Sequence, residues 1–522
     1  ALVKAVESAE DDAVAAIQDF NSLLISKDDD TGDGDGSTLS ESKVVYVGIT
    51  CGMSAPYIAG QLYHMMQNEG KQPNWSSILL GFNPIEASRK TPFEKWSVTT
   101  TDNSANFYQI CHQMNELSER NPNFIILNPV VNPEAITGST RMKGGSATKL
   151  LLDTIFASAY VSQLEESNVS TTSETIYRFL NGFQQTVLHT YQFANHHQDV
   201  AKLMQRASQS LLNGGNIYYL GVGNAGMIGF IDASECGPTY GAKPTDVQGF
   251  IVNGWRNVFE HRYDSIHPRM EDSIAIDTAD FEAHVLPTLT QHDTVFFLDI
   301  DSQFANERYA KEKEQLLQLA KKVQSHSQNP FVSYISVGAI EPNKACLYEA
   351  GVNLSKSTSP INNEYLPSND ELHMVRVRIP YMSLVPGLDG FAELSLKLVL
   401  NAITTGAHVL KGTVFGNRMI NLRVSNNKLF YRAIGIISNI VRVEESVARE
   451  NLLKAIYRSD DIAKYELEPI SKHIEIAVKT DKVVPLAMLL ASDSSISVET
   501  AMGVLEREVA VRNAIAKLGA SK

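Results

Sequence analysis

NPEAITGSTRMKGGSATKLLLD, residues Asn132–Asp153, decides the fold class of this 522-residue chain, because small and polar residues crowd together before a long apolar helix. Its hydroxyl and basic side chains are Thr137, Ser139, Thr140, Arg141, Lys143, Ser146, Thr148 and Lys149. A helix that begins near Ser146 would point unpaired backbone amides at an anion. A simple helix cap would explain Ser146 alone, whereas the basic residues and the two adjacent glycines favour a phosphate site.

A strand, a glycine loop and a helix also occur upstream. Residues 43–49 form an apolar run that is typical of a buried parallel strand, and the residues after it are Thr50, Cys51, Gly52, Met53 and Ser54. Pro56 suits the first position of a helix. Sheets of the α/β class present phosphate sites in such loops, at the carboxyl ends of their strands. Together the two segments predict a sugar-phosphate site in an α/β fold.

Five ordered segments then resemble one family, the proteins with paired sugar-isomerase (SIS) domains that comprise the N-acetylmuramic acid 6-phosphate etherases and the glucokinase regulatory proteins. The segments are AVESAEDD (5–12), GITCGMSAP (48–56), GSTRMKGGSATK (138–149), DASECGPTYGAKP (232–244) and TTGAHVLKGTVFGNRMINLRVSNNKL (404–429). The resemblance implies an α/β fold with two tandem, flavodoxin-like SIS domains of three layers around a parallel sheet, followed by an all-helical cap.

The length favours the regulatory branch of this family, which carries two SIS domains in one chain, whereas an etherase subunit carries one. A second strand, glycine loop and helix recur at residues 216–230. We expect a first SIS domain at 1–170, a second at 171–415 and a helical cap at 416–522. The first domain is expected to lack its opening strand and phosphate loop, and to contain an acidic, mobile loop at 27–42.

Apolar residues recur at helical spacing through the C-terminal region. The helices expected there span residues 427–441, 444–457, 485–491 and 497–518.

Composition limits the partners. The net charge of −14 and the pI near 5.5 argue against nucleic acid and anionic membranes, which need a basic surface. The four cysteines, Cys51, Cys111, Cys236 and Cys346, are widely spaced, which predicts reduced thiols and no metal pair. We expect no cofactor, and a cytoplasmic location with the nucleus as a second compartment.

The second half is expected to have lost its own ligand. Gly221, Gly223 and Gly226 fit a dinucleotide loop, but no acid ends the next strand, so they are interpreted as a tight turn. The later loop, residues 299–306, carries two acids that would repel phosphate.

By resemblance, Glu10 and Glu235 match the two carboxylates of the etherases, and Lys428 matches a lysine that reaches the sugar phosphate. The resemblance and the loop chemistry together give the expected ligand contacts, which are Glu10, Thr50, Cys51, Gly52, Ser54, Ser139, Thr140, Arg141, Glu235 and Lys428. The chain is therefore interpreted as a regulator that binds fructose 6-phosphate or fructose 1-phosphate and inhibits a glucokinase or hexokinase by association. The alternatives are an etherase that releases D-lactate with Glu10 and Glu235 as catalytic residues, and, more remotely, a sugar-phosphate isomerase.

Overall fold

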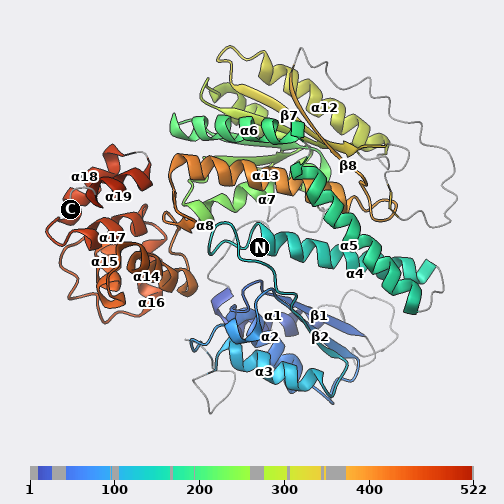
Figure 1. The fold of residues 1–522 in the computed structure, drawn as a ribbon, viewed down its shortest axis with the longest axis horizontal. Coiled ribbons are helices and arrows are strands. Elements are labelled where there is room, and N and C mark those ends of the chain that lie inside the picture. Colours follow the sequence, from blue (N-terminus) through green and yellow to red (C-terminus); the bar gives the residue numbers. More distant parts are fainter. Residues whose placement is uncertain are drawn as a thin grey trace. The chain divides into compact units, whose positions relative to one another are not determined.

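The computed structural model describes residues 10–25, 43–93, 96, 105–164, 169–192, 194–258, 275–301, 306–341, 346–347, 372–508 and 510–519. The predicted acidic loop at 27–42 lies outside these residues. The chain forms two compact units, drawn in Figure 1. The first contains Ala1–Thr148 and Ser425–Phe430, and the second contains Lys149–Val424 and Tyr431–Lys522.

The first unit is built on a parallel sheet of three strands in the order β1-β2-β3. These strands are β1 (Val44–Ile49), β2 (Trp75–Leu80) and β3 (Phe124–Leu127), and the helices of the unit include α1 (Ala13–Ile25), α2 (Pro56–Gln67), the short turn η2 (Ile85–Ala87) and α3 (Phe107–Ser118). A core of fully buried side chains, including Leu62, Leu79 and Phe107, joins this sheet to its helices. The apolar run at 43–49 therefore forms the expected parallel strand.

The second unit contains a parallel sheet of five strands in the order β5-β4-β6-β7-β8. The strands are β4 (Ile217–Gly221), β5 (Val247–Ile251), β6 (Thr294–Ile300), β7 (Phe331–Ala339) and β8 (His373–Ile379). Every residue of β4 and β6 is buried, as expected for central strands that are covered on both faces. The parallel α/β fold is confirmed.

Helices cover both faces of the second sheet. On one face, α13 packs against α5, α6 and α7, and on the other face α12 lies against β6 and β7 (Figure 1). The bounds of the helices before the C-terminal region are α4 (Lys143–Leu164), α5 (Val169–Gln192), α6 (Ala194–Leu212), α7 (Gly223–Ser234), α8 (Cys236–Tyr240), α9 (Gly254–Val258), α11 (Thr278–Asp280), η3 (Phe281–Val285), η4 (Leu286–Thr288), α12 (Glu307–Gln324) and α13 (Gly390–Lys411).

The C-terminal region was expected to be entirely helical, and it is helical apart from a small hairpin whose second strand lies within it. Its elements are β9 (Val414–Phe415), β10 (Arg418–Met419), α14 (Asn427–Val441), α15 (Glu445–Tyr457), α16 (Ile470–Ala477), α17 (Val483–Ser492), α18 (Val498–Arg507) and α19 (Val511–Gly519). All eight residues from Val483 to Leu490 are buried, because α15, α18 and α19 pack around α17. Within the described residues, no helix is both long and apolar enough to cross a bilayer.

The prediction of a single helix at 497–518 is wrong, because the structure has two helices there. Glu508 adopts extended backbone angles and ends α18. The chain then turns so that the amide of Arg512 donates to the carbonyl of Gly412, 2.9 Å away. This contact with the end of α13 replaces the continued helix.

Candidate ligand site

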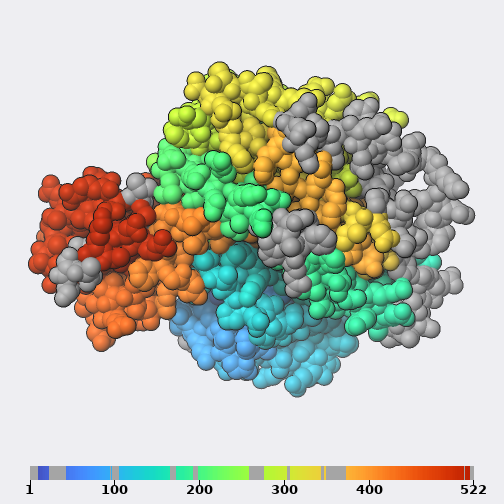
Figure 2. All heavy atoms as spheres, turned by 45° about the horizontal axis from the view of Figure 1, so that its top comes forward, coloured from blue at the N-terminus to red at the C-terminus, as the bar shows by residue number. Residues whose placement is uncertain are grey.

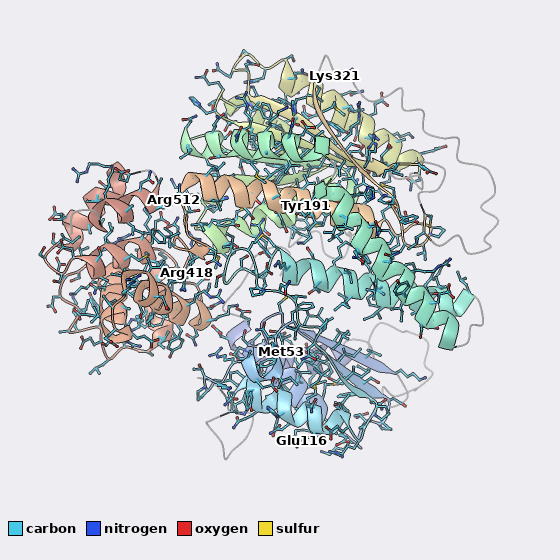
Figure 3. The ribbon with its side chains drawn as sticks, in the orientation of Figure 1. Met53, Glu116, Tyr191, Lys321, Arg418 and Arg512 are labelled. Atoms are coloured by element: carbon cyan, nitrogen blue, oxygen red, sulfur yellow. The ribbon has the colours of Figure 1, made fainter. Side chains whose placement is uncertain are left out.

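The loop after β1 is a tight turn fixed by Met53. The Met53 amide donates to the carbonyl of Thr50 (3.0 Å), and the Ser54 amide donates to the Thr50 hydroxyl (3.3 Å). Met53 has a left-handed backbone (φ 50°), and its side chain is completely buried in the first unit (Figure 3). Burial of this side chain offsets the cost of about 1–2 kcal/mol for the left-handed residue. The turn places the Ser54 hydroxyl just before α2.

The two segments that the sequence assigns to phosphate lie side by side in the first unit. A side chain at Gly144 would place its Cβ only 3.2 Å from the Cys51 sulfur, so the first turn of α4 lies directly against the loop. The Cys51 sulfur also lies 3.9 Å from the hydroxyl of Thr148. Burial raises the pKa of the Cys51 thiol, which keeps it protonated and makes it a poor nucleophile.

The start of α4 differs from the expectation. The helix begins at Lys143 instead of near Ser146, and its first amides already have acceptors. The amides of Lys143 and Gly144 donate to the two carboxylate oxygens of Glu134, at 2.9 and 2.8 Å. The amides of Gly145 and Ser146 donate to carbonyls of the preceding turn, at 2.7 and 3.1 Å. The expectation of unpaired amides at this helix start is therefore wrong, because an internal carboxylate occupies the position predicted for an external anion.

Glu134 is the functional candidate that the sequence reasoning missed. It lies within the segment quoted first, but its contact with α4 depends on a helix start that the sequence does not fix. The ammonium group of Lys143 donates to the carbonyl of Pro133, 2.7 Å away, and holds Glu134 in place. An acid shortly before a Gly-rich helix start is the only sequence signal for this arrangement.

The three contacts predicted at 139–141 differ in exposure. Ser139 and Arg141 are each 6% exposed, whereas Thr140 is exposed. The Ser139 amide donates to the carbonyl of Ile136 (3.2 Å) beside Gly138, whose φ of 96° is strained for other residues. Arg141 therefore brings a positive charge into the interior of the first unit, close in sequence to the start of α4.

Glu10 and Lys428 meet in the first unit, although 418 positions separate them. The Lys428 ammonium donates to Glu10 Oε1 at 2.7 Å, and the side-chain amide of Asn426 donates to the same oxygen at 2.9 Å. Both charged side chains are about one-third exposed, at 36% for Lys428 and 35% for Glu10. The pair is therefore accessible to a competing anion.

Asp11 strengthens this connection to the first turn of α14. Its carboxylate accepts the backbone amide of Asn427 at 3.2 Å. Burial raises the pKa of Asp11, the Asn427 amide opposes that shift, and the neighbouring charge of Glu10 adds to it. Residues 425–430 consequently belong to the first unit, while the remainder of α14 belongs to the second.

Glu235 belongs to the second unit and is exposed at the junction of α7 and α8. Its neighbour Asp232 is buried and accepts hydrogen bonds from the side chains of Asn401 (2.7 Å) and Thr404 (3.0 Å). The DASEC segment thus combines one structural carboxylate with one exposed carboxylate. The participation of Glu235 in a pocket with Glu10 stays a prediction.

The glycine loop of the second unit holds an internal carboxylate. Glu393 on α13 accepts the side-chain amide of Asn224 at 2.6 Å and pairs with Lys149 at 2.5 Å. Lys149 also pairs with Asp153 at 2.7 Å. Burial opposes the charge of Lys149, but the two carboxylates outweigh burial and raise its pKa. The position after β4 that would suit an anion is therefore filled from within the chain.

The helices α4 and α13 are counterparts in the two halves. KLLLD at 149–153 matches KLVLN at 397–401, and Lys397 donates to Asn401 at 2.8 Å as Lys149 does to Asp153. In this alignment Glu393 occupies the position of Gly145. An acid thus replaces a glycine of the predicted phosphate segment.

These features define a class, the proteins with paired SIS domains. Residues 1–66 match the N-terminal SIS domain of glucokinase regulatory protein, residues 194–341 its second SIS domain, and residues 416–515 its C-terminal lid domain.

Similarity to known proteins supports this assignment. A glucokinase regulatory protein from Xenopus laevis is 30% identical over 518 residues, which is 98% of this chain and 74% of the relative. An N-acetylmuramic acid 6-phosphate etherase from Clostridium acetobutylicum is 28% identical over 49% of this chain and 71% of its own length. The solved C-terminal domain of glucosamine-fructose-6-phosphate aminotransferase from Francisella tularensis covers 70% of this chain and 72% of that chain, at 11% identity and a TM-score of 0.36, which is too low to bear on fold or function. The chain belongs to the glucokinase regulatory protein family.

Proposed function

We propose that this protein is a regulator that binds a phosphorylated ketose, fructose 6-phosphate or fructose 1-phosphate, and inhibits a glucokinase or hexokinase by association. Membership of the family supports the regulatory role. The observation that carries the ligand proposal is the pair formed by Glu10 and Lys428, because it joins the first turn of α14 to the unit that contains both predicted phosphate segments. The remaining predicted contacts, from Thr50 to Ser54 and from Ser139 to Arg141, belong to the same unit.

In this proposal the sugar phosphate breaks the ion pair between Glu10 and Lys428 and binds both residues. The phosphate takes the ammonium group of Lys428, and the Glu10 carboxylate is released to accept a sugar hydroxyl. The exchange replaces one charge-assisted hydrogen bond with another, so it costs little. It also removes the ion pair that attaches the first turn of α14 to Glu10. The ligand would then favour one arrangement of the C-terminal helices over another, and an associated enzyme would respond to that change.

Thermal-shift titration of the full chain with fructose 6-phosphate and fructose 1-phosphate tests the ligand proposal. Binding to the folded state raises the midpoint as the ligand concentration increases. Lys428→Met should weaken the affinity by roughly tenfold to a hundredfold, as expected for the loss of one hydrogen bond between charged groups. The matched control is Lys472→Met, since Lys472 lies in the second unit and forms an exposed pair with Glu475 (3.2 Å). Equal affinities in both variants would refute the role of Lys428.

The regulatory part requires a second measurement, the inhibition of purified glucokinase by the full chain with and without each fructose phosphate. Inhibition that one of these sugars modulates supports the proposal. If neither sugar binds and the kinase keeps its full activity, the proposal fails.

The second candidate function is an etherase that acts on N-acetylmuramic acid 6-phosphate. The etherase relatives favour it, together with the presence of both Glu10 and Glu235, which could serve as base and acid. Release of lactate from this substrate, abolished by Glu235→Gln, would establish the enzyme and overturn the regulator as the primary function. The absence of lactate while fructose phosphates bind would favour the regulator.

The proposal keeps the division of the chain at 1–170, 171–415 and 416–522. Limited proteolysis of the full chain tests this division, since cleavage should concentrate near residues 170 and 415.

A further inference from the structure

The three-stranded sheet of the first unit has two different faces. Because side chains alternate along a strand, the register assigns every residue of β1, β2 and β3 to one face or the other. One face carries Tyr46, Leu79 and Phe124, which pack against helices of the unit. The other face is uncharged and consists mainly of aliphatic side chains, which are Val45, Val47, Ile49, Ser76, Ile78, Leu80, Ile125 and Leu127.

This second face is only partly covered. Val45 is 63% exposed and Ile125 is 45% exposed, and apart from Leu80 the other aliphatic residues of the face are half-buried. The second unit differs in this respect. Counting back along the chain from α4 and α13, which are counterparts, β1 corresponds to β6, and every residue of β6 is buried. Parallel sheets are normally covered on both faces, so the first unit presents a surface that a helix could cover.

Helix α5 of the second unit carries an exposed apolar stripe. Its inward side packs against α13 and β8. A helix turns by about 100° per residue, which places Ile176, Tyr177, Leu180 and Val187 within one sector of about 100° on the outer side. All four are exposed, Tyr177 most of all at 71%. Atoms of α5, blue-green in Figure 2, lie at the surface.

Charge is absent from both surfaces. Glu174 and Arg178, the acidic and basic residues of α5, fall outside the sector of the stripe. The sheet face has no charged member, although the chain as a whole has a net charge of −14. That charge makes two copies of the chain repel each other, so an uncharged surface is where they can approach most easily.

The two surfaces are also complementary in kind. Helices with an apolar stripe are the elements that cover sheets in α/β proteins, and the inward side of α5 already packs against a strand of the second sheet. One copy of the chain therefore supplies both a sheet face without full cover and a helix suited to cover such a face.

We infer that two copies of this chain associate through these surfaces, with α5 of each copy on the partly covered sheet face of the other. The arrangement is isologous, because each copy gives one helix stripe and receives one, and it closes as a dimer. Burial of the aliphatic residues of the sheet and the aromatic ring of Tyr177 provides the free energy of association.

Sedimentation equilibrium of the full chain at increasing concentrations tests the inference. The mass should rise from one copy to two. Val45→Lys and Tyr177→Glu each put an unpaired charge into the contact, and each should weaken dimerisation at least tenfold. Leu467→Lys is the matched control, since Leu467 is 98% exposed and belongs to neither surface, and it should leave the mass unchanged. The measurement needs neither a sugar nor a kinase, so its outcome does not depend on the proposed function.

A mixture of the two variants tests which surfaces meet. In a mixed dimer of Val45→Lys and Tyr177→Glu, opposite charges share one contact and the second contact carries no charge. The mixture should therefore associate at least tenfold more tightly than either variant alone, which a misfolded variant could not do. The inference is overturned if the unmodified chain keeps the mass of one copy, which would leave these surfaces to a different partner. It is also overturned if Tyr177→Glu associates with Tyr177→Lys and not with Val45→Lys, because α5 would then pair with α5.

Discussion

Replacing Glu134 tests whether an internal carboxylate closes the start of α4. The carboxylate accepts the amides of Lys143 and Gly144 at 2.9 and 2.8 Å. A hydrogen bond to a charged acceptor contributes about 1.5–3 kcal/mol, and a negative charge at a helix N-terminus contributes about 0.3–1 kcal/mol. Glu134→Gln keeps one neutral acceptor, so the opening free energy of the first turn should fall by about 1–2 kcal/mol. Glu134→Ala keeps no acceptor and should lower it by about 2–3 kcal/mol.

Hydrogen exchange of the full chain, followed by mass spectrometry of peptides that cover residues 132–148, measures this opening directly. A loss of 1–2 kcal/mol corresponds to exchange that is roughly 5–30-fold faster at the first turn. Local exchange is preferable to a global melting curve, because a chain with two compact units need not unfold in one step.

Glu116→Gln is the matched control, since Glu116 is exposed on α3 of the same unit (Figure 3). Its exchange at residues 132–148 should equal that of the unmodified chain. If both Glu134 variants exchange no faster than this control, the amides of α4 do not depend on the carboxylate and the reasoning is refuted.

Three other changes have definite expected outcomes. Lys313→Met leaves the buried carboxylate of Asp299 without its ammonium partner, which lies 2.8 Å away, so urea denaturation should show a loss of about 3–5 kcal/mol; a loss below 1 kcal/mol would contradict the pairing. Gly144→Val places a branched side chain against Cys51 and should cost about 1–3 kcal/mol, and Cys51→Ala should recover part of that cost in a double-mutant cycle, whereas strict additivity would argue against the contact. Burial raises the pKa of Asp11 above its ordinary value of 3.8, so its contribution to stability is complete below 3.8 and is lost as the pH rises through the folded-state pKa. Asp11→Asn should therefore gain stability relative to the unmodified chain as the pH rises above 3.8, and a difference in unfolding free energy that does not vary with pH would refute this sign.

The sheets could be predicted because central strands of parallel sheets are apolar throughout. The sequence predicts a strand at 43–49 and a strand, glycine loop and helix at 216–230, and the structure has β1 at Val44–Ile49 and β4 at Ile217–Gly221 followed by α7. The helix predicted at 427–441 has the same bounds in α14, since its apolar spacing is regular. The bounds of α18 and α19 could not be predicted as well, because they depend on a contact with Gly412, a residue that is far away in the sequence.

The site was predictable only in part. Glycine, hydroxyl and basic residues identify the two loop segments, and the structure places Cys51 beside Gly144 as their chemistry suggests. The pairing of Lys428 with Glu10 depends on the resemblance, because no local pattern relates residues so far apart. Glu134 was missed because its partners are backbone amides, whose availability follows from where a helix begins and not from residue type.

The buried helix α17 has a consequence for the protein inside a cell. Its eight consecutive buried residues, from Val483 to Leu490, are covered in part by α18 and α19. A protease that removes α18 and α19 would uncover an apolar segment of the kind that chaperones and degradation enzymes capture. The two helices thus protect the chain from quality control by keeping the α17 segment out of solvent.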